Sequence, residues 1–282
     1  MSFVYEERVC MNNNILELYH NGNQVMNEAV DRIVIGIYGM QRQYGAKSFL
    51  FTGASSNVGT TSIALNISIA LAEAGWKTLF VDCDFRKGKE YKRISAEAGR
   101  DLASFLSNNE TKAVDIVSQT TYPNLYYVSS GERFNTPVRL LCTEKMERVC
   151  NTFKNKYDFV IYDTPSINIV SDAKVLIPSV DRYVLVTGLN ITTKKQIMDA
   201  KVALLEFEEK NGGIIASRMD MSQYKKNIKN YDYFDESNLK KKSKEAAVTN
   251  KKPAAKKFKL TSLSGKKIKI NKKNQKGKAV EK

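Results

Sequence analysis

Residues 48–61 read SFLFTGASSNVGTT, an apolar segment followed by a loop of small residues and the start of a long apolar stretch. This order predicts a phosphate-binding loop between a buried strand and a helix. Backbone N–H groups of such a loop and of the first helical turn converge on an anion, and the helix dipole adds positive potential. We therefore expect this segment to hold a phosphate group at the end of a strand.

The loop departs from the usual pattern, G-x-x-x-x-G-K-[ST], in which the lysine reaches the β- and γ-phosphates and the hydroxyl reaches Mg²⁺. Gly59 and Thr61 hold their positions, but Ala54 replaces the first glycine and Thr60 replaces the lysine. The sequence thus predicts a cradle for ATP or ADP that lacks its usual cation. The loop residues expected at the nucleotide are Ser55, Ser56, Asn57, Val58, Gly59, Thr60, Thr61 and Ser62.

Strand and helix patterns alternate along the rest of the chain. We expect strands at 49–52, 77–81, 124–128, 157–163, 182–187 and 213–216, and helices at 24–44, 61–74, 102–106, 143–156, 172–177 and 193–210. Strands joined through helices by short connections form parallel sheets that are covered on both faces. The predicted fold is a doubly wound, mostly parallel α/β sheet of the P-loop NTPase type.

Composition divides the chain of 282 residues into three parts. A polar, asparagine-rich lead-in covers 1–23, and an α/β domain covers 24–237. Residues 238–282 hold 17 lysines against Glu245 and Glu281, so they carry the whole formal net charge of +15. A segment with this composition cannot bury enough apolar surface to fold alone. We expect it to be a disordered tail.

Several classes of protein are excluded by simple counts. No run approaches the length of about 18 apolar residues that a membrane-spanning helix needs, and residues 1–10 lack the pattern of a signal peptide. The four cysteines form no C-x-x-C pair, and the single histidine, His20, cannot complete a metal site with them. We expect a cytoplasmic protein with reduced cysteines.

Three aspartates follow expected strands. Asp82 and Asp84 end the segment 77–84, and Asp163 ends 157–163. The carboxyl ends of parallel strands share one edge of a sheet, where ligands bind. We therefore expect these three residues in catalysis, with Thr61, Asp82 and Asp163 as the ligands of Mg²⁺. For any one of them alone, a role as a helix cap or turn residue is the competing interpretation.

Segments around these aspartates resemble the bacterial tyrosine kinases of capsular and exopolysaccharide synthesis. The similarity lies in VDCDFRK at 81–87, FVIYDTPS at 159–166 and SDA at 171–173, and in the order of DLASFL, NLYYVSSG and TPVRLL between them. It covers roughly residues 25 to 235. The form it resembles is the stand-alone cytosolic kinase that works beside a separate membrane-anchored chain-length regulator, with a fold shared by MinD and ParA ATPases.

The resemblance implies further site residues and partners. Arg86 in the second motif and Ser217 after the last strand, where the family has an asparagine that reads the base, are expected at the nucleotide. The family carries a C-terminal tyrosine cluster that neighbouring subunits phosphorylate. Tyr224, Tyr231 and Tyr233 occupy that place, although ordinary surface aromatics would look the same. The expected partner is a membrane-anchored polysaccharide co-polymerase, the chain-length regulator.

Departures from the family pattern concern both catalysis and assembly. Thr60 and Ser55 stand where the family of folds places lysines. The oligomer motif, a glutamate and two arginines three apart, remains only as Glu28, with Asp31 and Val34 at the arginine positions. Loss of a loop cation typically removes a few kcal/mol of transition-state stabilisation. The sequence therefore predicts a weak kinase or pseudokinase that is a monomer or a partner-dependent oligomer.

Two alternatives remain open at this point. One is an active autophosphorylating tyrosine kinase in which Arg86, Lys87 or Lys47 replaces the missing cation. The other is a MinD/ParA-like positioning scaffold that is tethered by its basic tail. The tail favours an anionic membrane surface somewhat more than nucleic acid, since it has too few aromatics for base stacking. For the tail itself, a third interpretation is that it only keeps the protein soluble and binds no partner.

Overall fold

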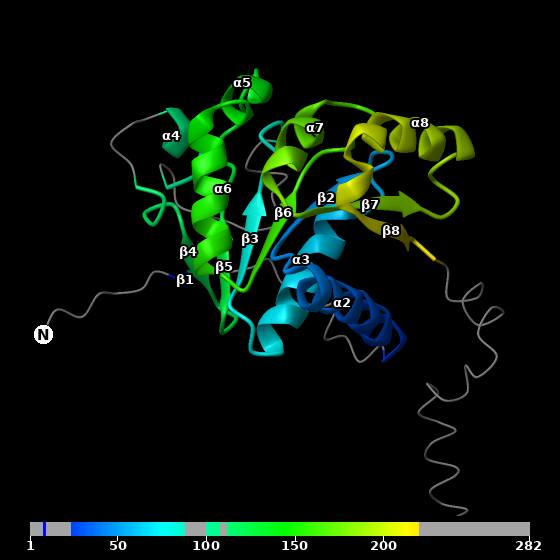
Figure 1. The fold of residues 1–282 in the computed structure, drawn as a ribbon, viewed down its shortest axis with the longest axis horizontal. Coiled ribbons are helices and arrows are strands. Elements are labelled where there is room, and N and C mark those ends of the chain that lie inside the picture. Colours follow the sequence, from blue (N-terminus) through cyan, green and yellow to red (C-terminus); the bar gives the residue numbers. More distant parts are fainter. Residues whose placement is uncertain (1–7, 10–23, 88–99, 108–111, 220–282) are drawn as a thin grey trace, which may run out of the picture. The chain divides into compact units, whose positions relative to one another are not determined.

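The structure is a computed structural model, and it describes residues 8–9, 24–87, 100–107 and 112–219 (Figure 1). The chain divides into two units, residues 1–229 and 230–282, and all described residues belong to the first. The candidate phosphoacceptors Tyr224, Tyr231 and Tyr233 and the lysine-rich segment 238–282 lie outside the described residues.

Eight strands form one sheet in the order β1-β4-β5-β3-β6-β2-β7-β8. Their bounds are β1 Arg8–Val9, β2 Ser48–Gly53, β3 Thr78–Asp82, β4 Ser118–Thr120, β5 Leu125–Val128, β6 Phe159–Asp163, β7 Arg182–Gly188 and β8 Asn211–Ser217. Among these described strands, β4 and β5 pair antiparallel and every other pair is parallel. The predicted doubly wound, mostly parallel fold is confirmed.

Helices cover both faces of the sheet (Figure 1). Their bounds are α2 Gln24–Tyr44, α3 Thr60–Glu73, α4 Leu102–Ser107, α5 Pro137–Leu141, α6 Glu144–Lys156, α7 Asp172–Leu176, η2 Ile177–Ser179, α8 Lys194–Leu204 and η3 Leu205–Lys210. Buried side chains of α2 and α3 share one hydrophobic core with one face of the strands. Those of α4 to α8 share a second core with the opposite face.

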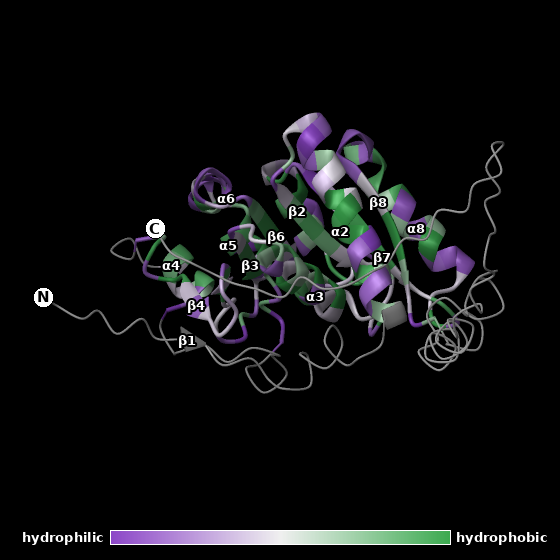
Figure 2. Cartoon of the chain, turned by 90° about the horizontal axis from the view of Figure 1, so that it is seen from below, coloured by the Kyte–Doolittle hydropathy of each residue, from purple (hydrophilic) through white to green (hydrophobic). Residues whose placement is uncertain are grey.

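Successive side chains of each central strand point to opposite faces of the sheet, so one strand contributes to both hydrophobic cores. In β2, Phe49 and Phe51 face the α2/α3 core, whereas Leu50 faces the other one. All three side chains are fully buried, because parallel strands between two helical layers have no solvent face. Figure 2 shows hydrophobic residues along the central strands and α3, and hydrophilic residues on the outer helix α6. This burial fixes the register of the central strands, and hence the positions of the residues that follow them.

The helix that follows the phosphate-binding loop is buried on all sides over most of its length. Residues 64–72 of α3 are all buried, because the sheet covers one side of this helix and α2 packs on another. A helix with no solvent face is held firmly along its length. The start of α3, and the loop that leads into it, are therefore anchored by two layers of packing.

One predicted element was wrong in detail, and three short elements were not predicted. The helix expected at 193–210 ends at Leu204, and 205–210 is a tighter 3₁₀ segment with a non-helical Phe207. Lys210 explains the change, because its ammonium donates to the carbonyls of Ile177, Pro178 and Val180 and pulls the last turn onto η2. In addition, β1, β4 and α5 were not expected, since segments of two to five residues are too short for a periodic pattern.

Within the described ranges, no helix has both the length and the apolar character that crossing a membrane requires.

Candidate functional site

The register of three neighbouring strands brings the acidic residues to the loop. Asp82 at the end of β3 lies opposite Asp163 at the end of β6, and Asp163 lies opposite Phe51 of β2. The phosphate-binding loop begins after Gly53, two residues beyond Phe51. Loop and carboxylates therefore meet at one edge of the sheet, as strand order alone requires.

The loop takes a conformation that suits anion binding. Asn57 and Gly59 both have left-handed backbones, with φ of 60° and 86°. Alternation of left- and right-handed residues turns successive N–H groups toward one point. Gly59 also occupies the N-cap of α3 and provides no side chain to cap the first N–H groups. The cradle is thus built from main chain, and Asn57 is one of the few non-glycine residues that tolerate its shape.

Gly53 permits the sharp return of the loop. A Cβ atom at this position would lie 2.9 Å from the Ser55 carbonyl oxygen, 3.0 Å from Thr60 Oγ1 and 3.0 Å from a Val58 methyl group. Thr60 therefore folds back over the start of the loop. Its hydroxyl is uncharged, so the position that usually contributes a lysine contributes no positive charge here.

Side chains from distant segments fix the loop from outside. The Ser55 and Thr192 hydroxyls are 2.8 Å apart, and the Asn168 amide donates to the Ala54 carbonyl at 2.7 Å. From the end of β8, Ser217 donates to the Val58 carbonyl and Arg218 donates to the Asn57 carbonyl at 2.8 Å. These bonds hold carbonyl oxygens on the outside of the loop, which leaves its N–H groups for an anion.

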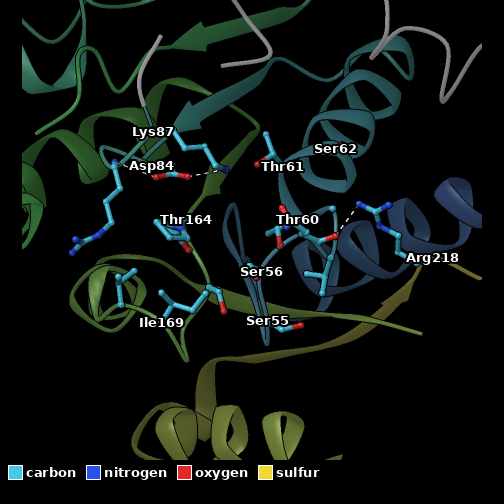
Figure 3. A pocket seen from close by; sticks show the side chains of 17 residues that line it. Ser55, Ser56, Thr60, Thr61, Ser62, Asp84, Lys87, Thr164, Ile169 and Arg218 are labelled. Carbon is cyan, nitrogen blue, oxygen red and sulfur yellow. Dashed lines mark hydrogen bonds and ion pairs between the residues drawn. The ribbon is translucent and has the colours of Figure 1, made fainter. Parts of the chain in front are cut away.

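A cleft of ≈ 440 Å³ lies over this loop. Figure 3 shows the loop on one side of it, Asp84 and Lys87 on a second side, and Thr164 and Ile169 opposite. Asp82 and Asp163 are buried below this lining. The residues that line the cleft are Ser55 to Ser62, Asp84, Arg86, Lys87, Thr164, Pro165, Ser166, Ile169, Val170 and Arg218.

Asp163 is the carboxylate best placed to take a cation. Burial and the nearby charge of Asp82 raise its pKa to about 7, while a hydrogen bond from Thr61 and the charge of Lys87 act in the opposite direction. Its Oδ1 atom is buried and has no hydrogen-bond partner among the described residues. An unpartnered carboxylate oxygen next to a threonine hydroxyl fits Mg²⁺, a hard cation that prefers oxygen ligands.

The other two aspartates are engaged by their own turn. Asp82 Oδ1 accepts from the Asp84 N–H at 2.8 Å and its Oδ2 accepts from Ser130 at 3.3 Å. Asp84 Oδ1 accepts from the Arg86 N–H at 3.1 Å. Both carboxylates thus shape the turn after β3, and Asp84 also lines the cleft. Their roles in metal binding and catalysis stay predictions.

Metal binding at this edge would depend on the nucleotide as well as on the protein. Among the described residues, no three acidic, cysteine or histidine side chains gather closely enough to hold a metal ion. Mg²⁺ usually takes one or two carboxylates and completes its shell with phosphates and water. The set predicted from the sequence, Thr61, Asp82 and Asp163, fits this kind of shared site.

The three candidate replacement cations have different surroundings. Arg86 donates from Nε and Nη2 to Asp172 at 2.9 and 2.8 Å, and Asp172 is fully buried. Lys47 precedes β2 and so lies at the opposite edge of the sheet from the loop, which excludes Lys47 as a replacement for the loop lysine.

Lys87 lies in the cleft, with its ammonium 2.8 Å from Asp84 Oδ2. Burial lowers the pKa of Lys87, but Asp84, Asp163 and Asp82 outweigh that effect and raise it overall.

Six cleft residues were not identified from the sequence, and two of them, Thr164 and Pro165, follow directly after Asp163. Arg218 comes from the end of β8, and Ser166 has a buried hydroxyl without a partner among the described residues. Ile169 and Val170 form an apolar wall. Ser166 is the last residue of the motif at 159–166, three positions after Asp163, and could have been predicted from that motif. No local pattern marks Arg218, since only the pairing of β8 with β7 brings it to the loop.

Comparisons with known proteins agree on the region that contains this cleft. A model of the AAA domain family matches residues 53–199. Putative tyrosine-protein kinase CapB of Staphylococcus aureus is 31% identical over 190 residues, which cover 67% of this chain and 82% of CapB. Tyrosine-protein kinase CpsD of Streptococcus agalactiae is 29% identical over 177 residues, covering 62% of this chain and 77% of CpsD.

Solved structures show the same architecture. The crystal structure of the chimerical protein CapA2B2 superposes with a TM-score of 0.67 at 25% identity, over 75% of this chain and 93% of that one. The kinase domain of the Escherichia coli tyrosine kinase ETK gives a TM-score of 0.67 at 23% identity, over 77% and 84% of the two chains. The likeness to ETK extends to the fold alone.

Proposed function

The chain belongs to the bacterial tyrosine kinase family, and we propose that it is a nucleotide-binding, kinase-like regulator of capsular or exopolysaccharide synthesis with weak or lost phosphoryl transfer. One observation carries the proposal. The main-chain cradle and the Thr61–Asp163 pair are in place, whereas the side chain at the lysine position is Thr60, which folds back on Gly53. Binding needs the cradle, and phosphoryl transfer needs the charge.

Different residues of the cleft have different proposed roles in binding the nucleotide and its metal. N–H groups of the loop 55–62 receive the phosphates of ATP or ADP. Thr61 and Asp163, with Asp82 beside them, would hold Mg²⁺, and this ion would supply positive charge against the phosphates. Asp84 lines the cleft close to Lys87 and is the candidate to orient an acceptor hydroxyl. Ile169 and Val170 offer apolar surface on one side.

Calorimetric titration of the full-length chain with ATP and ADP, with and without Mg²⁺, tests the proposal. We expect nucleotide binding that strengthens with Mg²⁺, and slow autophosphorylation. Thr60→Lys should raise nucleotide affinity or turnover by about tenfold or more, since a loop cation contributes a few kcal/mol to the transition state. The pseudokinase proposal fails if the natural protein labels Tyr224, Tyr231 or Tyr233 at a rate that the lysine variant does not exceed.

An active tyrosine kinase is the second candidate, and the position of Lys87 in the cleft favours it. It requires a positive charge near the phosphates from outside the loop. The same labelling assay decides between the two, because an active kinase would phosphorylate its tyrosine cluster without any change at Thr60.

We propose that the chain acts at the cytoplasmic face of a membrane, beside a membrane-anchored co-polymerase. The composition of residues 238–282 supports attraction to anionic lipids, since lysines near such a surface contribute on the order of 1 kcal/mol each. Deleting 238–282 should abolish sedimentation with anionic vesicles at low salt and leave the melting of the domain unchanged. Binding to duplex DNA but not to vesicles would instead favour a MinD/ParA-like scaffold.

We propose that the protein is a monomer, or that it forms an oligomer only together with its partner. Glu28, which remains from the oligomer motif, pairs with Arg32 of its own helix at 3.1 Å. Asp31 and Val34 offer no positive charge to a neighbouring subunit. Light scattering of the isolated protein should show no ring, and a stable ring without a partner would contradict this.

A further inference from the structure

One side of the cleft is rich in carboxylates, and a bound nucleotide would add further negative charge next to them. Asp82, Asp84 and Asp163 lie at or under one side of it, and the loop contributes no cation. Phosphates add several negative charges close to these carboxylates. Mg²⁺ offsets part of this repulsion, and P-loop proteins usually offset more with the loop lysine. A second source of positive charge in the cleft would therefore strengthen the binding that the main-chain cradle provides.

Lys87 meets the geometric requirements for that source. Its ammonium is held 2.8 Å from Asp84 Oδ2 at the cleft wall, and its side chain is half exposed. In Figure 3 the Lys87 side chain extends along the upper wall of the cleft, with its ammonium directed toward Thr61. The charge of Lys87 also acts on Asp163, so it lies on the side where the metal and the terminal phosphates would meet.

Its neighbours are less suited to this task. Arg86 has two donors fixed on a fully buried carboxylate, and their withdrawal would leave Asp172 unpaired. Arg218 approaches the loop from the other side of the cleft and donates to the Asn57 carbonyl (Figure 3). Asp84 is also buried, but it keeps the hydrogen bond from the Arg86 N–H when Lys87 leaves. The half-exposed Lys87, on a flexible four-carbon stem, can therefore exchange Asp84 Oδ2 for a phosphate oxygen.

We propose that Lys87, which follows β3, replaces the missing loop lysine by leaving Asp84 and contacting the terminal phosphates of a bound nucleoside triphosphate. The inference rests on the proposed nucleotide binding and goes beyond it by naming the residue that supplies the charge. It also explains how Thr60 is tolerated, because positive charge enters from the turn after β3 and not from the helix.

Calorimetric titration of full-length variants with ATP and ADP in the presence of Mg²⁺ tests the proposal. Lys87→Met should weaken ATP binding by about 10- to 100-fold, the range of a charge-assisted hydrogen bond, and should weaken ADP binding less. Lys87→Arg should stay within about threefold of the natural protein, because the charge is kept. Lys174→Met is the matched control, since Lys174 pairs with Glu206 outside the cleft and its loss should leave both affinities unchanged.

A double-mutant cycle sharpens the result. Thr60→Lys should increase ATP affinity at least about fivefold more in the Lys87→Met background than in the natural protein, since coupled residues are not additive. Equal gains in both backgrounds, or a Lys87→Met protein that binds ATP as the natural one does, overturn the role of Lys87 alone. Absence of nucleotide binding in the natural protein and in Thr60→Lys overturns the proposed function itself.

Discussion

The two halves of the cleft use different chemistry. The loop half, 54–61, presents main-chain N–H groups, and its shape depends on backbone angles and on outside bonds to its carbonyls. The carboxylate half depends on the side chains of Asp82, Asp84 and Asp163 at the ends of two strands. A main-chain cradle survives substitution of the side chains along it. The loop can therefore lose its lysine and keep its form, whereas a substitution in the carboxylate half changes a buried charge directly.

Arg86→Met should give the largest loss of stability. It leaves Asp172, which is 0% exposed, as an unpaired buried charge. Removal of one partner of a buried pair costs about 3–5 kcal/mol of unfolding free energy, and urea denaturation would measure it. Lys87→Met is the comparison. Its partner Asp84 is also buried, but Asp84 keeps the hydrogen bond from the Arg86 N–H, so we expect a smaller loss of about 1–2 kcal/mol. Equal losses for the two variants would show that Lys87 is structural.

Asp163→Asn should stabilise the metal-free protein at high pH. The pKa of Asp163 is raised to about 7 in the folded protein, so its ionisation is less favourable there than in the unfolded chain. Stability that is present at low pH is therefore lost as the pH rises from about 4 to about 7. Asparagine stays neutral and avoids this loss, which has an upper bound of roughly 4 kcal/mol.

Urea denaturation at pH 8 and pH 5, both without Mg²⁺, provides the measurement. We expect a clear gain for Asp163→Asn at pH 8, a gain less than half as large at pH 5, and loss of Mg²⁺-dependent nucleotide binding at both pH values. The same gain at both pH values would mean that the carboxylate is already ionised at low pH, and that burial does not govern its titration.

Gly53→Ala tests how far the loop half depends on backbone space. Its new methyl group would meet the Ser55 carbonyl at 2.9 Å, so the loop must shift. Overpacking of this kind costs about 1–3 kcal/mol, and nucleotide affinity should fall with it. Gly36→Ala is the matched control, since nothing lies within 4 Å of its Cβ position and helix α2 should gain about 0.5–1 kcal/mol. Thermal melting of both variants separates the two effects.

Much of the fold, and the sheet edge that carries the candidate site, could be predicted from the sequence. Apolar segments that end in acidic residues predicted the central strands and the sheet edge that these strands share. The helix α2 begins and ends at the predicted residues 24 and 44. Buried parallel strands leave a strong periodic signal, because burial restricts each position. The doubly wound fold and the bacterial tyrosine kinase family, expected from the same segments, are both confirmed.

The contacts that distinguish residues within the site could not be predicted. Arg86 and Lys87 are adjacent in sequence, and only the structure shows that one is held by buried Asp172 and the other lines the cleft. The bond from Arg218 to the loop joins residues 161 positions apart. Such pairings depend on side-chain direction and strand register, which composition and periodicity do not record.

The smallest effect concerns Arg218, where the loop half meets the end of β8. Its φ of 59° is unfavourable for a residue with a Cβ atom, and its guanidinium compensates by donating to the Asn57 carbonyl. Arg218→Gly removes both the strain and the bond, so the net change in unfolding free energy should be within about 0.5 kcal/mol. Arg218→Ala keeps the strain and loses the bond, and it should be less stable than the glycine variant by about 1 kcal/mol. Both variants should bind ATP more weakly than the natural protein, but less so than Lys87→Met, because the exposed Arg218 supports the loop from outside. If the alanine and glycine variants melt together, the left-handed backbone at Arg218 costs nothing, and the end of β8 does not constrain the loop in this way.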